Sequence, residues 1–458
     1  MGSGSDEVGG MVLGNRGYVF TLITAMLVLI ILSMIMFFTE VSAPSYEDSS
    51  NRMSVDELHF YVESVKKDAS RAISISGQRA SAYAIDHIIL TNETYGGYAM
   101  DNCTGFNYSL SGVEAALAEL MVCGTLDNAE EPTGNIRKYM LNNTVLSWTR
   151  RMGVNQTGGL PYNVTVKFRN MSMGQYDPWH YVIVSEFDLL VRDLSSNNEY
   201  RGYGIPVVST VDVSTLEDPS FHIQYDIPAE LRILEECGRE GVVDGEVLDL
   251  WIDEGCYHGS GNRYNAPSFF DRLEGRTSLS QKYVLRSREL LEDLGYEIEE
   301  IGLESLVNVD FLRDYNVSVN TNLSQVDYMY WNGVESTCGV SGMEKHPNFR
   351  IDVDHAVKYG VRGLNCEVGI DQDLDLEDFF TPDTITVPVN TTLTWVDHSG
   401  VDGGHELYII PNAWVGTKNV PANGRFQWFF NETGDYTVIC TSEDHDGFFP
   451  IHVMAGVE

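Results

Sequence analysis

The sequence predicts a multidomain protein with an N-terminal transmembrane helix, an α+β ectodomain and a C-terminal all-β sandwich. Three features indicate this: an uncharged apolar run near the N-terminus, a change from helical to alternating hydrophobic periodicity, and short, evenly spaced strands at the C-terminus. The 458 residues also exceed the size of one domain. We expect a cytoplasmic N-terminus or leader (1–17), the apolar helix (18–38), the ectodomain (44–370, with two subdomains divided near 215), an acidic linker (371–378) and the sandwich (379–458).

The apolar run extends from Tyr18 to Phe38 without a charged residue and is long enough to cross a bilayer as a helix. Arg16 precedes it, whereas acidic residues from Glu40 onward follow it. The positive-inside rule then leaves the N-terminus in the cytoplasm and the bulk of the chain outside, anchored at the cell surface. A cleaved secretory signal is the alternative, although the run exceeds a usual h-region and no small-x-small cleavage site is evident.

Arg16-Gly17, directly before the apolar run, resembles the processing site of type IV prepilins and archaeal class III signal peptides. Leu22 departs from that pattern, because these signals usually have glutamate at the fifth position after the cut. The resemblance implies an archaeal, pilin-like protein whose apolar helix packs in a filament core. Self-assembly into a filament or surface array is therefore expected beside membrane anchoring.

The expected outer surface of the protein is acidic and glycosylated. The formal net charge of −38 repels nucleic acid, so we expect no nucleic-acid partner. Asn-x-Ser/Thr sequons, the acceptors of N-glycans on exported chains, recur after the apolar run. They begin at Asn92, Asn102, Asn107, Asn142, Asn155, Asn163, Asn170, Asn316, Asn322, Asn390 and Asn431.

The ectodomain changes its pattern near residue 162. Ser54-Val-Asp-Glu57 is a capping-box pattern that predicts a helix start, and a second start at Ser111 leads into a helix that ends near Gly124. Alternation then predicts three strands of a mainly antiparallel sheet, in 164–168, 181–191 and 203–213, and a helix follows at 281–294. Carboxylate pairs such as Asp271 with Glu274 are expected on a solvated face, because acidic residues are abundant throughout the chain.

The C-terminal region is all-β. Strands are predicted at 380–387, 391–396, 406–410, 425–430, 436–440 and 451–454, separated by turns rich in Gly, Pro and Asn. Short strands at this spacing indicate a small sandwich.

Seven cysteines leave one over after pairing. Local spacing makes three short-loop disulfides the economical arrangement, although six cysteines allow many pairings. These disulfides are Cys103–Cys123, Cys237–Cys256 and Cys338–Cys366. They require an oxidising compartment, in agreement with export.

The remaining cysteine, Cys440, is followed five residues later by His445, and His405 lies earlier in the same region. A thiolate with two imidazoles is a soft, compact ligand set that suits copper. The sequence therefore predicts a copper centre with one Cu.

Three segments of this region resemble the cupredoxins, the blue-copper family of plastocyanin, halocyanin and azurin: FTPDTITVPVNTTLTWVDHSG, GHELYI and GDYTVICTSEDH. The resemblance implies a Greek-key sandwich with one type 1 copper, trigonal ligands His405, Cys440 and His445, and a weak axial contact from the Gly404 carbonyl. Phe449 stands where the family often has methionine, and phenylalanine cannot ligate. A His2Cys site without axial methionine should have an elevated reduction potential.

One-electron transfer at the cell surface is the expected function, and no catalytic residues are assigned. No phosphate loop, nucleophile elbow or HExxH motif is present. Acidic residues surround the Cys-to-His loop, so we expect a redox protein partner with a basic docking patch. The alternative is a structural pilin-like or surface-layer glycoprotein whose sandwich serves assembly or adhesion without metal.

Overall fold

A computed structural model describes the following residues: 16–100, 110–127, 135–154, 162–196, 198–238, 243–298, 300–371, 380–399, 404–411, 417–441 and 447–454. The first part contains α1 (Arg16–Thr91), α2 (Val113–Cys123), α3 (Ile136–Met140), α4 (Val145–Val154), β1 (Tyr162–Gln175), β2 (His180–Asp193) and β3 (Glu199–Asp212). The middle contains α5 (Ser220–Tyr225), η2 (Ala229–Leu231), α6 (Gly245–Glu254), β4 (Tyr257–Gly261), η3 (Asn262–Tyr264), α7 (Phe269–Leu273), α8 (Gln281–Glu292), β5 (Glu300–Ser305), α9 (Val309–Asp314), α10 (Asp327–Trp331), β6 (Cys338–Val340), α11 (Val353–Tyr359) and β7 (Leu364–Ile370). The C-terminal part contains β8 (Phe380–Thr381), β9 (Ile385–Pro388), β10 (Thr391–Asp397), β11 (His405–Ile410), β12 (Lys418–Val420), β13 (Arg425–Phe430), β14 (Gly434–Cys440) and β15 (Gly447–Met454).

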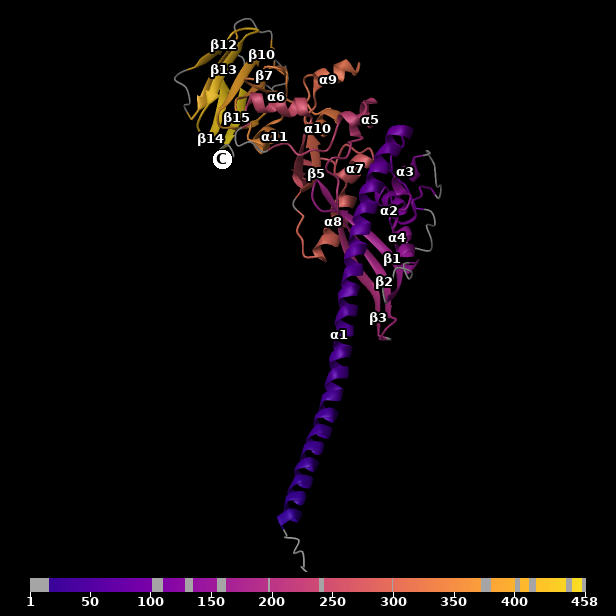
Figure 1. Cartoon of the computed structure of the whole chain (residues 1–458). Helices are drawn as coiled ribbons and strands as arrows, with labels where there is room; N and C mark the ends of the chain where they lie inside the picture. The colour runs from indigo at the N-terminus through magenta and orange to yellow at the C-terminus, as the bar shows by residue number, and fades with distance from the viewer. Residues whose placement is uncertain are drawn as a thin grey trace, which may run out of the picture. The chain divides into compact units, whose positions relative to one another are not determined.

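The longest element, α1, is one helix of 76 residues (Figure 1). Its segment Phe20–Thr39 has a mean hydropathy of 2.7 and exposed side chains, and within the described chain it alone is long and apolar enough to cross a membrane. An N-terminal anchor and a signal sequence both fit these properties. The predicted helix start at Ser54 is wrong, because Ser54 lies inside α1 and its hydroxyl donates to Asp193 Oδ2 at 3.1 Å.

The chain forms two compact units. One contains Met1–Asp68, Arg151–Lys167 and Asp188–Tyr203, and the other contains Ala69–Arg150, Phe168–Phe187 and Gly204–Glu458. The three predicted strands of the ectodomain are present as a sheet of order β1-β2-β3. The predicted helix end near Gly124 is also confirmed, since Gly124 follows α2 with the left-handed φ of 74° that glycine tolerates.

The C-terminal strands form two five-stranded sheets (Figure 1). The first has the order β13-β10-β7-β6, with β8 paired to β7, and the second has the order β12-β11-β14-β15-β9. Pairing is antiparallel except between β10 and β7 and between β15 and β9, which are parallel. The predicted combination of helices, sheets and C-terminal strands is thus present.

The sandwich begins earlier in the chain than the expected start at residue 379. Strand β7 pairs with β10 over six positions, and β6 pairs with β7. The apolar face of β7 is fully buried, and its residues belong to one continuous core that extends from Cys237 to Val453. The sandwich therefore shares its core with the preceding region. Most of the predicted acidic linker, 371–378, lies outside the described residues.

Candidate metal centre

Strand register brings His405 and Cys440 together. In the antiparallel pair of β11 and β14, Leu407 lies opposite Cys440, and His405 is two residues before Leu407. Side chains two residues apart on a strand share a face, so His405 and Cys440 are diagonal neighbours. Both are buried, with 1% and 0% of their surface exposed. Two of the predicted ligands thus meet inside the sandwich.

The two nitrogens of His405 have different neighbours. Nδ1 lies 3.8 Å from Cys440 Sγ. Nε2 lies 3.0 Å from Ser399 Oγ and 3.2 Å from Asp397 Oδ1. A carboxylate beside Nε2 stabilises the tautomer whose proton is on Nε2, so this N–H donates and Nδ1 keeps its lone pair. The nitrogen able to bind a metal therefore faces the thiol.

Asp397 is itself held in place at the end of β10. Its Oδ1 accepts hydrogen bonds from the Ser399 hydroxyl at 2.5 Å and the Ser399 amide at 2.8 Å, and its Oδ2 accepts from the Asn423 amide at 2.8 Å. Burial opposes ionisation of this carboxyl, but these hydrogen bonds and His405 outweigh burial and lower its pKa below the usual value. Asp397 is thus a charged acceptor in a fixed position for the imidazole.

Gly404 has a backbone that other residues cannot adopt at this place. Its φ is +74°, and a Cβ there would lie 2.2 Å from the carbonyl oxygen of Val420. Val420 is the β12 residue opposite His405. The glycine therefore lets the chain enter β11 against β12 and set His405 in register. The axial role of its carbonyl stays a prediction.

The distance between Nδ1 and Sγ fits a shared metal ion. Bonds of about 2.0 Å to nitrogen and about 2.3 Å to sulfur that met at roughly 120° would place these atoms about 3.7 Å apart. The observed separation is 3.8 Å. Cys440 is buried and outside the disulfides, and a metal ion that bound its sulfur would displace the thiol proton. The donor set present fits copper.

The other predicted site residues have different outcomes. His445 lies outside the described residues, and within those residues no group of three or more His, Cys, Asp and Glu side chains could hold a metal ion. Phe449 is buried, and its ring centroid lies 5.3 Å from that of Phe380. Met454 is exposed and seven residues from Gly447, the partner of Cys440, a span of roughly 23 Å along a strand.

The predicted disulfides agree with the described cysteines. Cys237 is bonded to Cys256 and Cys338 to Cys366. Cys123 is also disulfide-bonded, and its predicted partner Cys103 lies outside the described residues. The pairing of consecutive cysteines is thus confirmed for two pairs.

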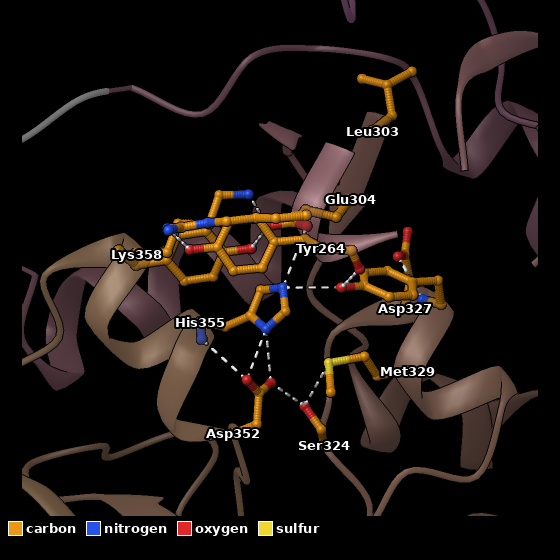
Figure 2. A network of polar contacts seen from close by, with 12 residues as sticks. Tyr264, Leu303, Glu304, Ser324, Asp327, Met329, Asp352, His355 and Lys358 are labelled. Carbon is orange, nitrogen blue, oxygen red and sulfur yellow. Dashed lines mark hydrogen bonds and ion pairs between the residues drawn. The ribbon is translucent and has the colours of Figure 1, made fainter. Parts of the chain in front are cut away.

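A second polar cluster surrounds His355 of α11. Figure 2 shows its imidazole between two carboxylates, with Asp352 at 2.8 Å from Nδ1 and Glu304 at 3.3 Å from Nε2. Lys358 and the Tyr359 hydroxyl donate to the other oxygen of Glu304. Burial opposes protonation of His355, but the two carboxylates raise its pKa to about 9. The cluster is therefore a buried network of ion pairs in which His355 is charged.

Two middle-region carboxylates are buried, so the expected solvated face is wrong for them. Asp271 closes a capping box with Ser268 at the start of α7, and burial raises its pKa to about 6. Glu274 accepts hydrogen bonds from Tyr283 and, at 2.8 Å, from Arg276. Asp271 thus caps a helix and Glu274 accepts hydrogen bonds from neighbouring side chains, so both carboxylates have a structural role.

The signal for Asp397 and Ser399 was present in the sequence. They flank His398 in the segment TWVDHSG, a few residues before His405. Metal-bound histidines usually give their second N–H to a carboxylate, so an acidic residue near a predicted histidine ligand is the feature to seek. The sequence cannot tell which of several nearby carboxylates it is, because the choice depends on the facing sheet.

No protein-family model and no curated protein matches the chain. Among solved structures, a purple cupredoxin from Nitrosopumilus maritimus is similar with 23% identity, over 19% of this chain and 98% of that one, at a TM-score of 0.17. Oxidised plastocyanin from Dryopteris crassirhizoma has 20% identity over 19% and 99% of the two chains, at a TM-score of 0.15. A copper-containing nitrite reductase from Thermus scotoductus SA-01 has 19% identity over 20% of this chain and only 23% of that chain, at a TM-score of 0.16.

Proposed function

We propose that this protein is a cell-surface type 1 copper protein that transfers single electrons. The observation that supports the proposal is the 3.8 Å approach of His405 Nδ1 to Cys440 Sγ, with the opposite nitrogen of the imidazole fixed by Asp397 and Ser399. A lone pair and a sulfur aimed at one buried point form a soft nitrogen-sulfur ligand pair. His445 is proposed as the third ligand.

The protein contributes rigidity to this chemistry. Copper bound here would supply one-electron chemistry by cycling between its cuprous and cupric forms. Cys440 lies in β14, the central strand of its sheet, and His405 contacts Asp397 of the facing sheet. Ligands held by two packed sheets move little when charge changes, which favours fast electron transfer.

We propose further that the site lacks a thioether ligand and has an elevated reduction potential. Phe449 fills the core beside the ligand strands, and Met454 is too far along β15 to reach Cys440. The absence of a weak axial ligand would favour the cuprous form, because one thiolate and two imidazoles satisfy the coordination that this form prefers. The expected electron partner is a redox protein with a basic docking patch, because the net charge is −38.

Copper reconstitution of the full chain in detergent tests this proposal. We expect one copper ion per chain and an intense visible band from thiolate-to-copper charge transfer, lost in Cys440→Ser and in His405→Gln. His452→Gln is the matched control, since His452 is an exposed histidine of the same sheet that pairs with Asp435. A colourless full chain that retains no copper after dialysis rules the proposal out.

A second candidate function is structural, as a pilin-like or surface-layer protein. The observation in its favour is the exposed apolar surface of α1 between Phe20 and Thr39, which can be buried in lipid or against other copies of the helix. Sedimentation of the full chain after detergent removal distinguishes these two roles of α1. Filaments visible by electron microscopy support assembly through the helix, and incorporation into vesicles as monomers supports a simple membrane anchor.

A further inference from the structure

A polar cleft lies beside the β6–β7 edge of the sandwich, on sequence segments that the copper site does not use. Its volume is about 250 Å³, and residues from 321–322, 339–341, 347–350 and β7 line it. Pockets for drug-sized ligands span roughly 300–1,000 Å³, so this cleft suits a smaller molecule, of the size of a monosaccharide.

The lining combines donors and acceptors. Three of its residues are asparagines, Asn322, Asn348 and Asn365, and an amide side chain offers both an N–H and a carbonyl oxygen. Arg350 and Glu367 add one charge of each sign. A carboxylate in the wall disfavours a phosphate, and the scarcity of apolar side chains disfavours a lipid or aromatic ligand. Neutral hydroxyl groups, which donate and accept, match this lining.

The wall of the cleft is ordered by contacts behind it. The Thr394 hydroxyl donates to Asn365 Oδ1 at 3.0 Å and accepts from Gln427 Nε2 at 3.0 Å, so the Asn365 amide turns its N–H groups away from β10. Arg350 Nη1 donates to the Thr337 carbonyl at 3.0 Å. These side chains are held before any ligand arrives, which reduces the entropy lost on binding.

Asn322 distinguishes this cleft, because it is both a lining residue and the acceptor of an Asn-Leu-Ser sequon. It is exposed, and its backbone is fixed on both sides: its N–H donates to Asn320 Oδ1 at 3.0 Å and its carbonyl accepts from the Ser336 amide at 2.9 Å. A saccharide joined to this side chain starts at the cleft itself.

We propose that Asn322 is glycosylated and that the first sugar of its glycan occupies the cleft, where the amides of Asn348 and Asn365 bind it. A short covalent tether gives the sugar an effective concentration in the millimolar range, so weak hydrogen bonds suffice to keep it docked. This proposal is independent of copper.

The test uses the full chain purified from the cells that produce it. Peptide mass spectrometry should find a glycan on Asn322. Hydrogen exchange should then show amides of 339–341 and 348–350 protected in the wild type and exchanging about tenfold faster in Asn322→Gln. Asn316→Gln is the matched control: it removes an exposed sequon outside the cleft and should leave these amides unchanged.

Asn348→Ala provides a second arm, because its exposed side chain lines the cleft while the sequon stays intact. It should keep the glycan mass on Asn322 and still lose the protection. An unmodified Asn322 overturns the proposal. A glycan that is present but whose removal leaves exchange at 339–341 and 348–350 unchanged also overturns the proposal, since the sugar would then extend into solvent.

Discussion

Asp397 Oδ1 and His405 Nε2 lie 3.2 Å apart and come from facing sheets of the sandwich. The contact orients the imidazole so that Nδ1 points to Cys440, and it links β10 to β11 across the core. The orientation of a proposed copper ligand in one sheet therefore depends on a carboxylate in the other.

Asp397→Asn should weaken copper binding without unfolding the protein. If the oxygen of the new side-chain amide faces His405, its NH2 faces the Asn423 amide and that hydrogen bond is lost; in the opposite orientation the hydrogen bonds from His405 and the Ser399 amide are lost. Loss of such a supporting carboxylate typically lowers metal affinity about 10- to 100-fold. Titration against a chelator of known affinity measures this, and Asp435→Asn, beside the exposed His452, should change nothing.

Gly404→Ala should destabilise the sandwich and displace His405. The added Cβ would lie 2.2 Å from the Val420 carbonyl oxygen, and φ of +74° is strained for alanine. We expect a loss of about 1–3 kcal/mol in the free energy of unfolding, together with weaker copper binding. Urea unfolding measures the free energy of unfolding of this variant, and Gly238→Ala is the control, because a Cβ at Gly238 meets no atom within 4 Å. Equal stability of the two variants contradicts the prediction.

Phe449→Met should lower the reduction potential of the copper-loaded protein. Phe449 lies on the buried face of β15 opposite Val438, two residues from the Gly447–Cys440 pair, so a thioether there comes within reach of the ligands. The substitution also loosens contact with Phe380, at a cost of about 1–2 kcal/mol. Spectroelectrochemical titration gives the potential. An unchanged potential with intact copper binding shows that position 449 is not axial to the metal.

His355→Gln should change the pH dependence of stability. The folded pKa of His355 is about 9, above the unfolded value of about 6.5, so its charge stabilises the fold fully below about pH 6.5 and less as pH rises through 9. The variant should lose about 3 kcal/mol at pH 6 and distinctly less at pH 9.5.

The contact between His355 and Glu304 also affects Glu304. Burial opposes ionisation of this carboxyl, but the hydrogen bond with His355 outweighs burial and lowers the pKa of Glu304 to about 2. This is one interaction seen from both partners, so the two effects do not add. Urea unfolding at several pH values measures the profile, with His180→Gln, beside Asp177 at the surface, as the control. A constant difference between pH 6 and 9.5 would mean that His355 acts through packing alone.

Ile370→Ala should weaken copper retention although Ile370 precedes the expected sandwich boundary. Ile370 is fully buried in β7 and stands opposite Asp397 of β10 in the parallel register. The cavity should cost about 2–5 kcal/mol and loosen the strand end that carries Asp397. Ile227→Ala is an equally buried control in a different core cluster and should keep copper. Equal copper loss in both variants contradicts the coupling.

The sequence predicted the strands around Cys440 well, because alternation within β10, β11, β13 and β14 is strong and turns separate them. Strand β7 was not assigned to the sandwich, since the acidic run after Ile370 suggests a boundary and parallel pairing with β10 leaves no local signal. Register across strands 27 residues or more apart in the chain is set by the shared core, which composition does not reveal.

Local motifs failed where tertiary contacts took over. Ser54 has the residues of a capping box, yet the helix continues through it because its hydroxyl binds Asp193 instead. His355 contacts Asp352, which lies three residues before it and caps the same helix, and Glu304, which belongs to β5. The first contact is readable as an i, i+3 pair; the second needs the fold.

Consecutive pairing of the cysteines has a consequence for the order in which the disulfides can form during synthesis. Cys237 pairs with Cys256 and Cys338 with Cys366, so each partner emerges soon after the first and each disulfide can close before the next cysteine appears. Cys440 emerges last, when the earlier thiols are consumed, and the sandwich then closes over it. Synthesis from the N-terminus thus allows the earlier cysteines to pair with one another and leaves Cys440 outside the disulfides.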